Sequence, residues 1–87
     1  MHEFSLIASL LNKIEAIARE QQATKVTGVR VRLGALAHIS ADHLREHFEQ
    51  GARGTIAEGA RLDIIEKRDL TEPHAQEILL ESVVVKT

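Results

Sequence analysis

The sequence predicts an α/β fold, a two-layer sandwich in which a small mixed three-stranded sheet carries two helices on one face, in the order α-β-α-β-β. An opening stretch with helical apolar spacing, an alternating stretch after it, and a passage from strand through helix to strand predict this arrangement. Because such passages run as right-handed crossovers, we expect the first two strands to be parallel. A short connector before the last strand favours an antiparallel return. With 87 residues, a single domain over 1–87 is expected.

The first helix is predicted over residues 3–22. Apolar side chains recur there at the i, i+3, i+4 spacing of an amphipathic helix, and charged ones fall elsewhere. The apolar set is Phe4, Ile7, Leu10, Leu11, Ile14, Ile17 and Ala18. The polar stretch at 21–25 is expected to end the helix.

The first strand is predicted from alternation. Val29, Val31 and Leu33 alternate with Arg30 and Arg32, which is the period of a strand with one buried face. The apolar side chains are therefore expected to point inward and the arginines outward.

The second helix is predicted to begin after Ser40, a favourable N-cap, and to bury Leu44, Phe48 and Ala52 on one side. Two glycines are expected to weaken and end it, Gly51 and Gly54.

Two further strands close the chain. Leu62, Ile64 and Ile65 mark one of them, and Ile78–Val85 marks the other, which is rich in β-branched residues. Between them, about residues 69–76 form a short polar connector that contains the only proline. The sheet face opposite the helices is expected to be solvated or covered by a partner.

Composition excludes several functional classes. A net charge of −2 gives no electrostatic reason to expect nucleic acid or an anionic membrane surface as a partner. The absence of cysteine rules out disulfides, thiolate nucleophiles and cysteine zinc sites. The opening has neither a basic segment nor an uninterrupted apolar run, so we expect no signal peptide or membrane span and a cytoplasmic location. No nucleophile constellation, phosphate-binding loop or paired carboxylates indicate an enzyme.

The opening residues Met1, His2 and Glu3 offer donors to a metal ion. In such a sequence the α-amine, the amide nitrogen of His2 and its imidazole can close two fused chelate rings around one ion. Planar nitrogen coordination suits Ni(II) or Cu(II). The first four N–H groups of a helix have no intrahelical acceptor, so the amides of His2 and Glu3 stay available. Glu3 could ligate through its amide or carboxylate, or could simply offset the helix dipole beside a chance histidine.

Three stretches resemble, in order and spacing, the HypA/HybF family of hydrogenase nickel-incorporation proteins. They are MHEFSL at 1–6, VTGVRVRLG at 26–34 and RGTIAEGARL at 53–62. The likeness extends over about residues 1–68, and 78–85 resembles the closing strand of the family. The resemblance implies a metallochaperone that carries Ni(II) to the large subunit of nickel–iron hydrogenase, or to urease, beside a GTPase called HypB. It also implies a nickel site at Met1, His2 and Glu3.

The chain departs from the family pattern at two places. The family inserts a zinc-binding domain with paired CxxC motifs between its last two strands, where this chain has only the connector at 69–76. No zinc is therefore expected, and the strands that flank the connector can remain neighbours. The family also carries acidic residues where this chain has Ala35 and Ser40. Asp42 and His38 are left as candidate supporting ligands for nickel.

Other histidines are given a structural interpretation. His43 and His47 lie four residues apart on the second helix, so both imidazoles project from one side and could hold a metal ion. Leu44 and Phe48 already account for the buried stripe, so we expect the pair to lie toward solvent or its edge and to be incidental. His74, in the connector, is expected to have no role.

Three arginines are expected to form a basic face on the open side of the sheet, namely Arg30, Arg32 and Arg61. Alternating exposed charges are what a solvated sheet face usually carries. Because the helices cover the other side, this face is the natural docking surface for a GTPase, a client or a second copy in a homodimer.

Two functions compete. The first is a reduced nickel metallochaperone that delivers its ion by ligand exchange at an exposed terminus. The second is a scaffold or adaptor that keeps the fold and has lost nickel delivery, which the missing zinc domain favours.

Overall fold

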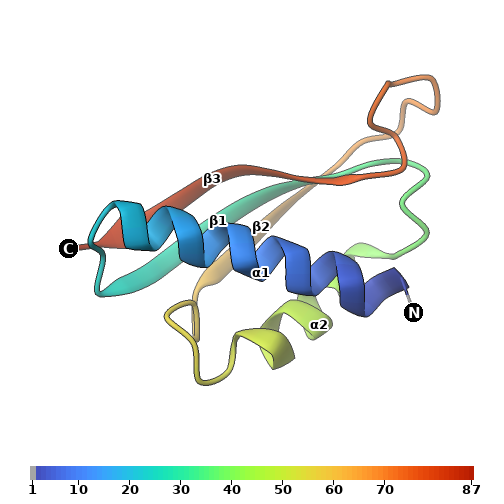
Figure 1. The fold of residues 1–87 in the computed structure, drawn as a ribbon. Coiled ribbons are helices and arrows are strands. Elements are labelled where there is room, and N and C mark those ends of the chain that lie inside the picture. Colours follow the sequence, from blue (N-terminus) through green and yellow to red (C-terminus); the bar gives the residue numbers. More distant parts are fainter. Residues whose placement is uncertain (1) are drawn as a thin grey trace.

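The computed structural model describes residues 2–87, with side chains from Ser5 onward. In chain order the elements are α1 (His2–Glu20), β1 (Lys25–Leu33), α2 (Ala41–Ala52), β2 (Arg61–Glu66) and β3 (Ile78–Lys86). Figure 1 shows α1 and α2 over the same face of the sheet. The predicted two-layer α-β-α-β-β arrangement is therefore confirmed.

The strand order in the sheet is β2-β1-β3. β1 pairs in parallel with β2, with Val29 opposite Leu62, and antiparallel with β3, with Val29 opposite Val83. Both strand orientations were predicted correctly. The expectation that the strands flanking the connector are neighbours is wrong, because β1 lies between β2 and β3. The connector must therefore carry the chain across the end of β1.

The core lies between the sheet and the two helices. Its largest fully buried side chains come from α1, β1 and α2, namely Ile14, Val26, Val31, Leu44 and Phe48. In β1 the buried positions alternate with exposed or half-buried ones along the second half of the strand. The helical and strand periodicities read from the sequence thus identify the buried faces correctly.

α1 ends two residues before the predicted position. The Ala23 N–H donates to the Ala18 carbonyl at 2.9 Å, the Gln22 N–H donates to the Arg19 carbonyl at 3.1 Å, and Gln22 has a φ of 54°. This is the Schellman type of helix end, with glutamine in the left-handed position that glycine usually takes. The chain therefore reverses within four residues into β1.

Ser40 begins α2 as predicted, since its Oγ accepts a hydrogen bond from the His43 N–H at 3.1 Å. Ser40→Ala is expected to lower the free energy of unfolding by about 1 kcal/mol, because one first-turn donor loses its acceptor. Urea unfolding followed by circular dichroism measures this loss. Ser40→Asp, which restores an acceptor, should keep wild-type stability, and an Ala variant as stable as the Asp variant would contradict the cap.

Backbone hydrogen bonds join the connector between β2 and β3 to loop 34–40. The Gly34 N–H donates to the Glu77 carbonyl at 3.0 Å, and the Leu36 N–H donates to the Ala75 carbonyl at 2.6 Å. Ala75 is buried. The segment is thus a packed part of the fold, and its removal or lengthening would change the support of loop 34–40.

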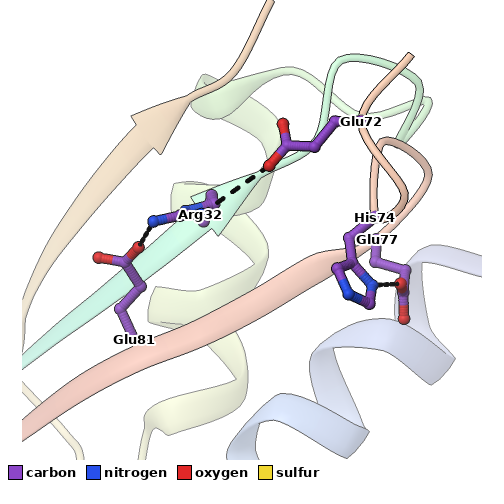
Figure 2. A network of polar contacts seen from close by, with 5 residues as sticks. All are labelled: Arg32, Glu72, His74, Glu77 and Glu81. Carbon is purple, nitrogen blue, oxygen red and sulfur yellow. Dashed lines mark hydrogen bonds and ion pairs between the residues drawn. The ribbon is translucent and has the colours of Figure 1, made fainter. Parts of the chain in front are cut away.

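The connector also carries its own polar contacts. The Thr71 hydroxyl and N–H both donate to the Asp69 carboxylate, and these bonds lower the pKa of that exposed carboxyl. His74 was expected to have no role, yet its Nδ1 contacts the Glu77 carboxylate (Figure 2). These contacts hold the connector locally and involve no ligand.

Candidate metal centre

The start of α1 is the first part of the candidate site. α1 begins at His2, one residue before the predicted start. The N–H groups of His2 and Glu3 therefore belong to the first turn, whose donors have no intrahelical acceptor. Met1 and the side chains of His2 and Glu3 lie outside what the structure describes, so their role as ligands stays a prediction. The backbone N–H groups that this prediction requires do lie in the first turn of a helix.

The lengths of α1 and β1 fix which segments lie near that start. α1 has 19 residues and β1 has 9. These lengths correspond to about 28 Å of helix and about 30 Å of strand. Because a tight turn joins them in antiparallel directions, the start of α1 and the end of β1 reach the same end of the molecule, as Figure 1 shows. Loop 34–40 and the start of α2 follow directly from that end of β1.

The candidate supporting ligands lie on this segment. His38 is exposed in the loop with a φ of 59°, and Asp42 is exposed in the first turn of α2. Ser40 uses its hydroxyl to cap α2 and is not free to ligate. The loop and the first turn of α2 therefore bring two exposed donors, an imidazole and a carboxylate, to the end of the molecule where α1 starts.

No three His, Asp or Glu side chains gather around a common point in the part of the chain described from Ser5 onward. The His43 and His47 rings form a pair on α2, with centroids 6.2 Å apart and an interplanar angle of 68°. His43 is exposed and His47 is half-buried, which agrees with the expected position toward solvent or its edge. A complete metal centre would therefore need donors from the first residues of the chain.

The open face of the sheet carries charges of both signs. The Arg32 guanidinium lies 2.5 Å from the Glu81 carboxylate and 3.8 Å from that of Glu72 (Figure 2). Arg61 pairs with Asp63 at 3.3 Å. The expectation of a basic face is therefore wrong, because acidic side chains on β2, β3 and the connector alternate with the arginines.

An open cavity of about 460 Å³ between α2 and the outer edge of β2 was not foreseen from the sequence. At its wall the Arg45 guanidinium donates to the Leu62 carbonyl at 2.6 Å. Unpaired carbonyls on an edge strand invite association with another strand. Arg45 therefore covers part of this edge, which only the strand order could have revealed.

None of the helices within residues 2–87 combines the length and the apolar character that a bilayer crossing requires.

Comparison with known proteins places this fold and opening in one family. A family model described as "Hydrogenase/urease nickel incorporation, metallochaperone, hypA" matches residues 1–72. A hydrogenase maturation factor HypA from Methylocella silvestris is 52% identical over 64 residues, which cover 74% of this chain and 57% of that protein. One from Archaeoglobus fulgidus is 42% identical over 71 residues, which cover 80% of this chain and 64% of that protein. The chain thus spans about 60% of the length of these relatives.

Solved structures agree on the fold. The solution structure of the Ni metallochaperone HypA from Helicobacter pylori superposes with a TM-score of 0.82 at 21% identity, covering 99% of this chain and 98% of that one. A second HypA solution structure gives a TM-score of 0.76 at 21% identity, with 98% and 96% coverage. The resemblance drawn from the three sequence stretches is confirmed, and this chain belongs to the HypA family of hydrogenase and urease nickel-incorporation proteins.

Proposed function

We propose that this chain binds Ni(II) through its first residues and passes the ion on during maturation of nickel–iron hydrogenase or another nickel enzyme. The observation that carries this proposal is that the family match starts at residue 1 and includes the Met1-His2-Glu3 opening. The relatives are named as maturation factors, which supports a carrier and not a catalyst. Nickel is cargo here.

The donor set would be the α-amine of Met1, the amide nitrogen and imidazole of His2, and the amide or carboxylate of Glu3. The first-turn position of both amides supports this set, since they are not committed to helix hydrogen bonds. Nitrogen donors in a plane suit Ni(II), and Cu(II) would compete in vitro. His38 and Asp42 are proposed as weaker supporting ligands from the adjoining segment.

The remaining parts of the proposal concern domains and partners. Residues 1–87 would form one nickel-binding domain, with the connector in place of the zinc-binding domain and no zinc bound, which the lack of cysteine supports. A HypB-like GTPase and a hydrogenase large subunit in the cytoplasm would be the partners, as the family suggests. The mixed-charge open face would receive one of them or a second copy.

A scaffold without nickel delivery is the competing function, favoured by the short connector. Nickel titration by calorimetry distinguishes the two, using protein whose first residue is an unmodified Met1. His2→Ala removes the imidazole and so opens one of the two chelate rings, and we expect it to weaken Ni(II) binding by about a hundredfold or more, beyond the effect of losing an outer-shell partner. His74→Ala, an exposed connector histidine, is the matched control and should bind like wild type. Identical titrations for wild type and His2→Ala would support the scaffold.

A further inference from the structure

One side of α2 packs closely on α1 at Gly51. A Cβ added there would lie 2.8 Å from Leu11 Cδ1 and 3.4 Å from Ile7 Cγ2. His47 precedes Gly51 by four residues and so lies on the same stripe, one turn or about 5.4 Å earlier along the helix. Its half-buried state fits this position, whereas His43, a further turn earlier, is exposed. The stripe that contacts α1 therefore leads from Gly51 back to the two histidines.

The direction of the helices tells which part of α1 the histidines approach. α1 turns back into an antiparallel β1, and α2 joins β1 to the parallel β2, so both helices run opposite to β1 and in the same sense. Figure 1 shows both helices running this way. Going back eight residues from Gly51 to His43 covers about 12 Å, which along α1 leads from Leu11 to the first turn. The histidine pair is therefore expected beside the first turn of α1.

The two rings are arranged so that one ion could bind both. Their centroids lie 6.2 Å apart. An imidazole bound at about 2.1 Å has its centroid about 3.2 Å from the ion, so two rings at neighbouring positions on one ion have centroids about 4.6 Å apart. Histidines at i and i+4 on a helix are a known chelating arrangement for divalent metals, and imidazole suits nickel. A small rotation of the side chains would close the remaining gap.

We propose that His43 and His47 supply imidazole nitrogens to the Ni(II) ion held by the first residues of the chain. This inference rests on the proposed function, because no third ligand joins the pair among the residues described from Ser5 onward. The pair links α1 to α2 through the ion, and loss of these two outer ligands is the step that frees coordination positions for transfer.

The test compares four proteins that all start with a free Met1, namely wild type, His43→Gln with His47→Gln, His2→Ala, and His74→Gln as the matched control. Each is titrated with Ni(II) by calorimetry, and X-ray absorption counts the imidazoles on the bound ion. Urea unfolding of the metal-free proteins detects any folding defect from the half-buried His47. If the double variant is destabilised, His43→Gln alone replaces it, since its exposed side chain cannot affect the core.

We expect the double variant to bind one ion at least about tenfold more weakly and the imidazole count to fall by two. With His43→Gln alone, the count should fall by one. The control should match wild type. If His2→Ala weakens binding while the double variant keeps wild-type affinity and imidazole count, this inference is overturned and the proposed function stands. If His2→Ala has no effect, the proposed function fails and the shared site fails with it, whatever the pair binds alone.

Discussion

Gly34→Ala is expected to destabilise the fold by about 3 kcal/mol or more, the upper range for overpacking. A Cβ at this position would lie 2.2 Å from the Ala75 carbonyl oxygen and 2.7 Å from that of His74. Both are backbone atoms, so no side-chain rotation relieves the clash. The Gly34 N–H is also bonded to the Glu77 carbonyl at 3.0 Å, so relief requires the connector to leave the loop.

Urea unfolding followed by circular dichroism measures this effect, and Gly28→Ala is the matched control. Gly28 lies in β1, the strand that ends just before Gly34, and a Cβ there would meet Val84 Cβ at 3.6 Å, an ordinary contact. The control should change the free energy of unfolding by less than about 1 kcal/mol, within the span of strand propensities. Equal stability of the two variants would contradict the close approach of the connector backbone to Gly34.

Adding two residues before Met1 is expected to weaken Ni(II) binding by about a hundredfold or more, comparable with His2→Ala. The extension turns the α-amine into an amide and so removes one donor from the chelate, while every side chain stays in place. Amines are much better ligands than neutral amides for a divalent ion that prefers nitrogen. Calorimetric titration measures the change. The same two residues added after Thr87 provide the control, and equal weakening by both extensions would exclude the α-amine as a ligand.

The helices and strands could be predicted because the apolar residues within each of them recur at the spacing of a helix or of a strand. The apolar spacing around Ile14, the alternation around Val31 and the cap at Ser40 each depend on residues within one element. The parallel and antiparallel senses followed from the lengths of the connections. Local pattern was therefore sufficient for the two helices, the three strands and their buried faces.

The strand order and the contacts between distant segments could not be predicted. Nothing local to Gly34 indicates that Ala75, 41 positions later, lies against it. The charges around Arg32 were misjudged for the same reason, since Glu81 comes from another strand. His43 and His47 were assigned to solvent or its edge because a single helix does not reveal where the next helix begins. Only the parallel directions of α1 and α2 lead us to expect this pair near the first turn of α1.

The most direct test of nickel binding at the first residues is anomalous diffraction at the nickel edge, from crystals grown with Ni(II) and an unmodified Met1. We expect one dominant peak at the start of α1, bounded by the Met1 nitrogen and the His2 imidazole. A dominant peak elsewhere, for example at His74 and Glu77, with no nickel at the start of α1, would contradict this site.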